Sequence, residues 1–275
     1  MQREEIKAGV LRIEGTNCED ESNLAFKRLG IQSEKVHLKQ LIGEDVDPDE
    51  ERDLHEYDIL MFPGGFSAGD YVRAGAIFGA RMKSRLAAEL EKYIDTGKPV
   101  LGVCNGFQVL VEMGALPAMD ELMSSVPKAA LETNESNRFE CRPSLLQVEE
   151  NSNCIFTRKY KQDDTVLYPS AHKEGKFVLN NDITIEHLED NDQIVFRYTT
   201  PDGSEPTYPW NPNGSKDHIA GICNPQGNVL GLMPHPERVF SRYTKPDWTR
   251  SKVDMEQGDG RLLFESAIEY IENNF

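Results

Sequence analysis

Residues 99–114 read Pro-Val-Leu-Gly-Val-Cys-Asn-Gly-Phe-Gln-Val-Leu-Val-Glu-Met-Gly, and this stretch decides the fold. An apolar run typical of a strand, 100–103, leads without a linker into a segment whose apolar residues recur at helical spacing up to Gly114. The chain therefore changes from strand to helix at Cys104. We expect a buried strand, a tight turn at Cys104 and a helix that packs on the sheet.

The segments before this stretch show the same alternation. Residues 6–13 and 57–62 are apolar runs of strand type, and the second ends at a Pro-Gly-Gly turn, 63–65, which cannot continue a central strand. Between 76 and 96 the apolar residues recur at helical spacing, and Gly97 ends that predicted helix. This alternation predicts an α/β fold with a mostly parallel central sheet and helices on both faces.

After about residue 140 the chain becomes strand-rich. Short apolar runs, among them 176–179, are separated by Gly, Pro, Asn and Asp, and we expect them to complete the same sheet. The last segment, 260–275, has the spacing of a closing helix. Two stretches rich in Pro, Gly and charge, 199–217 and 242–259, are predicted to be loop insertions.

The composition argues against several classes of protein. The 275 residues include 30 Lys and Arg against 47 Asp and Glu, and the net charge of −17 opposes the phosphate attraction on which nucleic-acid binding depends. No apolar run approaches the roughly 18 residues of a membrane-spanning helix. The five cysteines form no CxxC pair, which argues against structural zinc and disulfides and favours the reducing cytoplasm.

Cys104 is the strongest candidate for a catalytic residue. Gly102 and Gly106 permit the tight strand-to-helix turn known as a nucleophile elbow, and the start of the following helix stabilises a negatively charged sulfur. The alternative is that Cys104 is a small buried apolar residue. Its setting between two glycines at the end of an apolar strand disfavours that alternative.

A catalytic thiol needs a base, and the motif Met-Pro-His-Pro-Glu at 233–237 supplies one. The prolines restrict the backbone around His235, and Glu237 can orient the imidazole and stabilise its charged form. The alternative is a solvent-facing histidine on a Pro-rich loop. The motif follows an apolar run, so we expect His235 at the same sheet edge as Cys104. Because these residues come from opposite halves of the chain, we predict a single domain over residues 1–275.

Two further features complete the expected site. The Pro-Gly-Gly-Phe-Ser turn, 63–67, follows a strand, and its glycines can direct backbone N–H groups toward a developing negative charge. Gln108 lies one helical turn after Cys104 and can hydrogen-bond an amino-acid substrate. Each feature also has a plain structural alternative, an ordinary turn in the first case and an exposed helix glutamine in the second.

Taken together, these residues resemble the class I, triad-type glutamine amidotransferases, whose fold is flavodoxin-like. The finer resemblance is to the glutaminase subunits of phosphoribosylformylglycinamidine synthases, a family of the purine pathway. Matching blocks run in consistent order along the chain: GTNCE (15–19), PGGFSAGDYVRAGAI (63–77), GKPVLGVCNGFQVL (97–110), RFECRP (138–143), AHKEGKF (171–177) and GNVLGLMPHPERVF (227–240).

This resemblance implies a role for each matching residue. Cys104 is expected to attack the carboxamide of L-glutamine, giving a glutamyl thioester and ammonia, while His235 moves the protons and Glu237 orients it. Backbone N–H groups would form the oxyanion hole, and four residues would hold the glutamine. The oxyanion hole is expected at Gly65 and Asn105, and the glutamine contacts at Gly64, Phe66, Gln108 and His172. No metal ion is expected in this chain.

The resemblance also implies partners. Ammonia would pass to a large ATP-dependent synthetase subunit that converts formylglycinamide ribonucleotide to formylglycinamidine ribonucleotide, with a small accessory subunit beside it. The chain has no GxxxxGK[ST] loop, so ATP and Mg²⁺ are expected on the large subunit. Tyr208, Trp210 and Trp248 are candidates for partner contacts or for local packing. Two alternatives stay open: the glutaminase of another synthase, and a catalytically silent DJ-1-like binding or sensing module.

Overall fold

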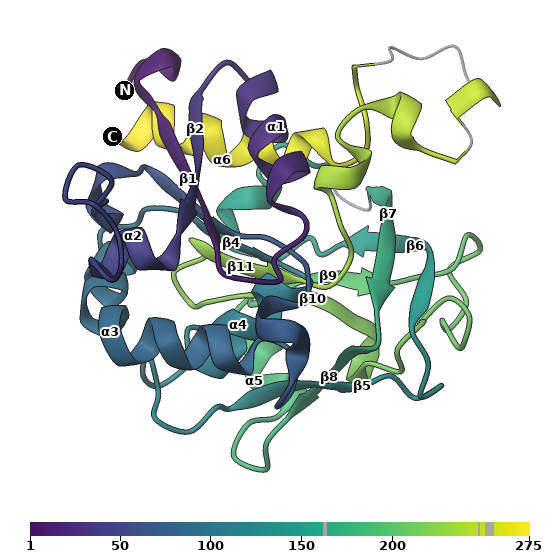
Figure 1. Ribbon diagram of the computed structural model, residues 1–275. Coiled ribbons are helices and arrows are strands. Elements are labelled where there is room, and N and C mark those ends of the chain that lie inside the picture. Colours follow the sequence, from purple (N-terminus) through teal and green to yellow (C-terminus); the bar gives the residue numbers. More distant parts are fainter. Residues whose placement is uncertain (162–163, 247, 251–255) are drawn as a thin grey trace.

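The structure is a computed structural model that describes residues 1–161, 164–246, 248–250 and 256–275. Within these ranges nine strands form one mixed sheet in the order β2-β1-β3-β4-β11-β10-β9-β6-β7 (Figure 1). Its strands are β1 (Lys7–Arg12), β2 (Gln32–His37), β3 (Ile59–Phe62), β4 (Val100–Val103), β6 (Glu140–Val148), β7 (Thr165–His172), β9 (Ile194–Tyr198), β10 (Ile219–Cys223) and β11 (Val229–Leu232).

Helices cover both faces of the sheet, so the predicted α/β fold is confirmed (Figure 1). Helices α1 and α6 pack against each other on one face, and α3 packs against α2 and α4 on the other. Their bounds are α1 (Glu19–Arg28), α2 (Leu38–Ile42), α3 (Ala76–Asp95), α4 (Asn105–Met113), α5 (Ile185–Asp190) and α6 (Arg261–Asn274).

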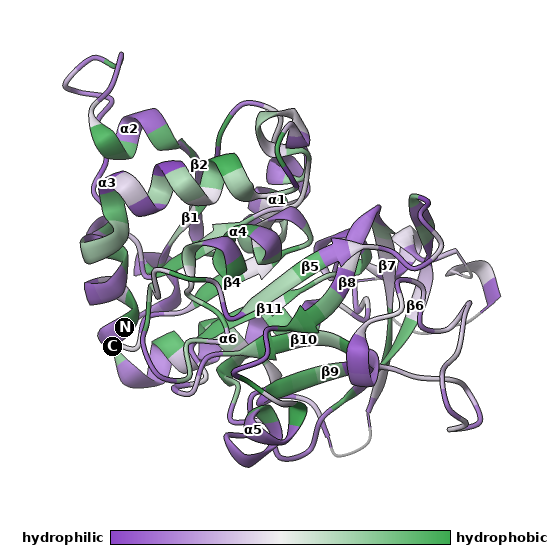
Figure 2. Cartoon of the chain, turned by 90° about the horizontal axis from the view of Figure 1, so that it is seen from below, coloured by the Kyte–Doolittle hydropathy of each residue, from purple (hydrophilic) through white to green (hydrophobic). Residues whose placement is uncertain are grey.

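The core lies between the sheet and these helices. Strands β3, β4 and β11 are buried along their whole length, and Figure 2 shows the central strands as the most hydrophobic part of the chain. Aromatic pairs join the layers: Phe26 of α1 meets Phe264 of α6 at 5.3 Å, and Phe62 of β3 meets Phe78 of α3 at 5.7 Å between ring centroids. Such pairs add to the burial of apolar area that stabilises the fold.

The parallel part of the sheet determines where the candidate site lies. Strands β4 and β11 are parallel neighbours, with Val103 beside Leu232. Because the carboxyl ends of parallel strands meet at one edge, Cys104 after β4 and His235 after β11 leave the sheet at the same edge. The two halves of the chain therefore meet at this edge.

The strand-rich C-terminal half continues the sheet with antiparallel pairs from β11 to β7. One expectation is wrong: the run at 176–179 belongs to β8 (Glu174–Leu179), which pairs with β5 (Ala129–Thr133) in a separate two-stranded sheet. Phe177 of β8 stacks on Phe107 of α4 with ring centroids 6.2 Å apart. The apolar side of β8 therefore covers α4 rather than extending the main sheet.

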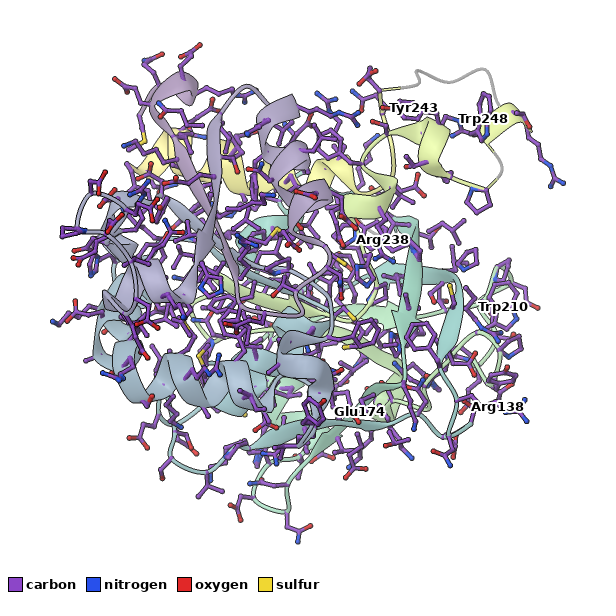
Figure 3. All side chains as sticks on the ribbon, in the orientation of Figure 1. Arg138, Glu174, Trp210, Arg238, Tyr243 and Trp248 are labelled. Carbon is purple, nitrogen blue, oxygen red and sulfur yellow. The ribbon has the colours of Figure 1, made fainter. Side chains whose placement is uncertain are left out.

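The two stretches predicted as loop insertions differ. Residues 199–217 form no strand, as predicted, but Asn211, Asn213 and Ser215 within them are buried. Of residues 242–259, positions 247 and 251–255 lie outside the described residues. Trp210 and Trp248 are partly exposed at the periphery (Figure 3). Among the helices of the described ranges, none has the length and apolar character needed to cross a bilayer.

Candidate active site

Cys104 occupies a strained turn between β4 and α4. Its φ of 52° and ψ of −107° are unusual for a residue with a side chain. The backbone N–H of Cys104 donates to Leu232 O at 2.8 Å, which ties the turn to β11. The sulfur is almost buried and lies 3.7 Å from Ala171 O at the end of β7. This is the geometry of a nucleophile elbow, which presents a reactive side chain from a rigid support.

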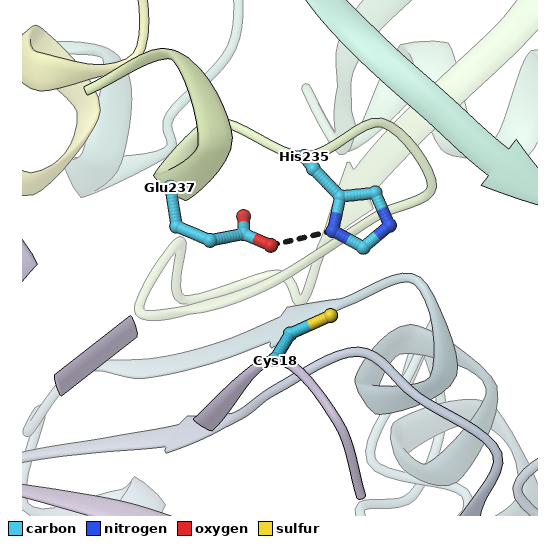
Figure 4. A group of neighbouring side chains, drawn as sticks. All are labelled: Cys18, His235 and Glu237. Atoms are coloured by element: carbon cyan, nitrogen blue, oxygen red, sulfur yellow. Dashed lines mark hydrogen bonds and ion pairs between the residues drawn. The ribbon is translucent and has the colours of Figure 1, made fainter. Parts of the chain in front are cut away.

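His235 and Glu237 form a buried pair at the same edge. Nδ1 of His235 lies 2.5 Å from Oε1 of Glu237 (Figure 4), and both side chains are at most 1% exposed. The backbone N–H of His235 donates to Pro169 O at 2.8 Å, which fixes the motif against β7. Because the carboxylate accepts from Nδ1–H, the other ring nitrogen, Nε2, is left as the basic atom; it is buried without a partner among the described residues.

The surroundings of His235 favour its charged form. Burial alone lowers the pKa of His235, but the charge of Glu237 and the neighbouring Cys104 raise it well above the ordinary value. A histidine held in this way can accept the proton of a nearby thiol and keep it close by.

A second thiol, which sequence reasoning assigned no role, lies beside this pair. Cys18 precedes α1, and its sulfur points toward the His235 ring (Figure 4). Burial raises the pKa of Cys18, so the thiol stays protonated at neutral pH. Its only sequence signal is the block 15–19, whose Thr16 forms a β-bridge with Gly65.

These side chains also include the one metal-like donor set found among the described residues. The ligand atoms of Cys18, His235 and Glu237 all lie within 4.8 Å of one another, and sulfur, nitrogen and oxygen are zinc ligands. However, Nη2 of Arg238 donates to the sulfur of Cys18 at 3.1 Å, and Nδ1 is already bonded to the carboxylate. The guanidinium charge opposes a cation here. The expected absence of a metal stays a prediction.

The Pro-Gly-Gly turn lies directly against the pair. A Cβ on Gly64 would stand 2.7 Å from Cε1 of His235 and 3.1 Å from the sulfur of Cys18, so only glycine fits. The next residue, Gly65, has a φ of 143°. Among the described residues, the N–H groups of Gly65 and of Asn105 donate no hydrogen bond. Both are therefore available to a negatively charged oxygen, as an oxyanion hole requires.

A small cavity of about 220 Å³ opens at Cys104. It is smaller than the roughly 300–1,000 Å³ of pockets for drug-sized ligands, which suits a single amino acid. Three of the four expected glutamine contacts line it, whereas Gly64 lies beneath it. Its wall consists of Gly65, Phe66, Asp70, Ala74, Cys104, Gln108, Phe139, Ala171, His172, Lys173 and Glu174.

Two of these wall residues are already engaged. Gln108 accepts from Nδ2 of Asn105 at 3.0 Å through Oε1 and donates through Nε2 to Glu174 O at 2.5 Å. Its carboxamide therefore ties α4 to β8 and has little capacity left for a ligand. Phe66 is half exposed and packs on Phe139, with ring centroids 6.4 Å apart, at the mouth of the cavity.

His172 keeps one donor for the cavity, and Asn213 determines which. Oδ1 of Asn213 accepts from the backbone N–H of Ser215 at 3.0 Å, so its Nδ2 is the donor that lies 3.1 Å from Nε2 of His172. Burial and then the charge of His235 lower the pKa of His172 to about 3, so the ring is neutral. Its proton is therefore on Nδ1, which is buried without a partner among the described residues. This support comes from within the stretch predicted to be a loop insertion.

A cysteine on an elbow, a His–Glu pair at the end of the adjacent parallel strand and an amino-acid-sized cavity define a triad-type glutamine amidotransferase. Residues 5–271 match the family model of the CobB/CobQ-like glutamine amidotransferase domain. Within that class, the chain belongs to the PurQ family of phosphoribosylformylglycinamidine synthase subunits. It is 52% identical to PurQ of Archaeoglobus fulgidus, covering 99% of both chains, and 43% identical to PurQ of Picrophilus torridus, covering 94% of this chain and 96% of the relative.

Solved structures agree with this assignment. A chain in the structure of PurLQS from Thermotoga maritima matches with a TM-score of 0.71 at 30% identity, covering 97% of this chain and 99% of that one. A putative GMP synthase component from Thermoplasma acidophilum, at 16% identity, matches in fold alone with a TM-score of 0.51, covering 97% and 94%. The resemblance inferred from the sequence motifs is thus confirmed.

Proposed function

We propose that this chain is the glutaminase subunit of a phosphoribosylformylglycinamidine synthase. It hydrolyses L-glutamine to glutamate and ammonia, and the ammonia converts formylglycinamide ribonucleotide to formylglycinamidine ribonucleotide on a synthetase subunit. The observation that carries the proposal is the meeting of Cys104 with the His235–Glu237 pair beside an amino-acid-sized cavity. The identity to PurQ relatives over the full chain supports the acceptor.

The reaction follows from these positions. Cys104 transfers its proton to His235 and attacks the carboxamide carbon, and the oxygen takes up negative charge facing the N–H groups of Gly65 and Asn105. His235 then protonates the leaving nitrogen, so ammonia departs and a glutamyl thioester stays on the sulfur. Water, deprotonated by His235, attacks the thioester to release glutamate and the thiol. Glu237 holds the imidazole in the tautomer that both steps need.

Several observations support partners for this chain. The Thermotoga maritima relative was solved as PurLQS, and we propose an equivalent large synthetase and small accessory subunit here, with ATP and Mg²⁺ on the large one. Tyr71 and Val72 are 90% and 69% exposed in the segment that follows the cavity residue Asp70, and so large an apolar exposure favours a docking surface. All five cysteines are free, which fits a cytoplasmic location.

Replacement of Cys104 by alanine in the assembled enzyme tests the function. Glutamine-dependent synthesis should disappear while synthesis from added ammonia persists, because only the glutaminase step uses the sulfur. The matched control is Cys141→Ala, since Cys141 is an exposed free thiol. Loss of both activities, or full glutamine-dependent activity in Cys104→Ala, would contradict the proposal. Product formed only with another acceptor would point to a different synthase.

A further inference from the structure

Two carboxylates on the cavity wall take no part in the reaction described above. Asp70 ends the short 3₁₀ helix Ser67–Asp70, and Glu174 begins β8. Both line the cavity that contains Cys104, although they lie far apart in the sequence. Figure 3 shows where Glu174 projects from its strand. A cavity that must accept a substrate with its own charges makes such a pair informative.

The environment of Asp70 leaves its charge unbalanced. Oδ1 of Asp70 is buried without a hydrogen-bond partner among the described residues. Burial, and then the charge of Glu174, raise the pKa of Asp70 to about 6. Arg73, the nearest cation in sequence, is held away in a two-bond ion pair with Glu112. A buried carboxylate of this kind is stabilised by a bound cationic group.

Glu174 is held so that it reinforces this negative end. Its Oε2 accepts from the backbone N–H of Ala74 at 2.9 Å, and its backbone oxygen accepts from Gln108. These bonds fix the strand end of β8 against the loop that follows Asp70. The negative charge of the pair is thus built into the cavity wall.

The opposite polarity is present as well, and it is an independent observation. His172 is 3% exposed, lines the same cavity and keeps an N–H on Nδ1 without a partner among the described residues. A buried N–H donor complements a carboxylate and repels a metal cation. The cavity therefore offers acceptors and a donor to one ligand. A free α-amino acid, with its ammonium and carboxylate groups, satisfies both.

We propose that Asp70, reinforced by Glu174, binds the α-ammonium group of glutamine, while Nδ1–H of His172 binds its α-carboxylate. This inference rests on the proposed glutaminase function and adds the residues that make the site specific for free glutamine. Asp70 is a specificity-determining residue, because it contacts the substrate at its α-carbon end rather than at the reacting carboxamide.

Kinetics of the assembled enzyme with two substrates test the proposal. L-Glutamine carries the α-ammonium group, whereas glutaramate is the same molecule without it. Asp70→Asn should raise KM for glutamine at least about tenfold with kcat nearly unchanged, as expected for loss of a charged hydrogen bond. Its kcat/KM for glutaramate should stay within about twofold of the parent protein. His172→Gln should lower kcat/KM for both substrates by similar factors, because both carry the carboxylate.

Asp192→Asn is the matched control, since Asp192 is an exposed aspartate with a similar positive φ of 54° and lies outside the cavity wall. If Asp70→Asn fails to fold in a thermal melt, Glu174→Gln replaces it under the same criterion, because its amide oxygen can still accept from Ala74. Equal losses for the two substrates, or no loss for glutamine, would overturn the proposal. Absence of glutamine hydrolysis by the parent complex would instead refute the glutaminase function itself.

Discussion

Arg238 donates a hydrogen bond from Nη2 to the sulfur of Cys18 at 3.1 Å, and this contact joins the residue after Glu237 to the start of α1. Cys18 in turn lies beside the ring of His235. Two thiols therefore flank one catalytic histidine. They differ in setting: Cys104 lines the cavity on a strained turn, whereas Cys18 is held beneath the Pro-Gly-Gly turn.

This difference predicts selective labelling. A glutamine-derived chloroketone should modify Cys104 and leave Cys18 unmodified in the assembled enzyme. Burial raises the pKa of Cys18, so that thiol lacks the thiolate form that reacts. Peptide mass mapping measures the site of modification. In Cys104→Ala no label should appear, and label on Cys18 in that variant would show that the second thiol is also a nucleophile.

Glu237→Gln should lower kcat on the order of 10²-fold with little change in KM. The carboxylate fixes the proton of His235 on Nδ1 and raises the pKa of the ring, and an amide supplies neither the charge nor a fixed acceptor. Glutaminase kinetics against pH measure the effect, and the pKa assigned to His235 should fall. Glu186→Gln, at an exposed position, is the control. Activity within twofold of the parent would exclude an orienting role for Glu237.

Gly64→Ala should inactivate the enzyme more than tenfold and lower the free energy of unfolding by about 1–3 kcal/mol. Gly64 lies outside the left-handed region, so its backbone accepts alanine. The cost arises because the added Cβ displaces His235 and Cys18. Activity assays and thermal melts measure the two effects.

Gly203→Ala is the comparison for that variant. Gly203 has a φ of +72° but no atom within 4 Å of an added Cβ, so alanine there should cost about 1 kcal/mol of stability and leave activity intact. If Gly64→Ala kept full activity, His235 would not depend on the close approach of this turn.

Asp70→Asn should stabilise the free chain at neutral pH. The pKa of Asp70 is raised from 3.8 to about 6 in the folded protein, first by burial, so its charge destabilises the fold above pH 6. The gain should fade as the pH drops from about 6 toward 3.8, where the folded and unfolded chains bind the proton equally. Solvent screening of this partly exposed group limits the gain to about 1 kcal/mol, or about 2–4 °C in Tm. A Tm difference that does not change with pH would contradict this origin.

Local patterns were sufficient to predict much of the fold and the candidate triad. Cys104 stands where strand periodicity changes to helix periodicity within one short stretch, and His235 stands in a motif after an apolar run. Parallel neighbours then bring them together, because β4 and β11 end at the same edge. These features depend on residues adjacent in sequence, which is the information that periodicity carries.

The remaining wall of the cavity depends on contacts between distant segments. Asp70 meets Glu174 only because β8 leaves the main sheet to cover α4, and no pattern in residues 176–179 distinguishes that course from a tenth strand of the sheet. Asn213 was hidden in the same way. Its stretch is rich in polar residues, yet its amide is buried because His172, Gly175, Tyr198 and Ser215 satisfy it.

The parallel pairing of β4 with β11 also sets an order in time. A ribosome that has just made Cys104 must add 131 more residues before His235 exists, which takes roughly 7 to 26 seconds at about 5–20 residues per second. During that interval β4 lacks the neighbour on one side and presents an unpaired apolar edge, the kind of surface that chaperones cover. The nascent chain therefore carries its nucleophile before its base, and it cannot consume glutamine until synthesis is nearly finished.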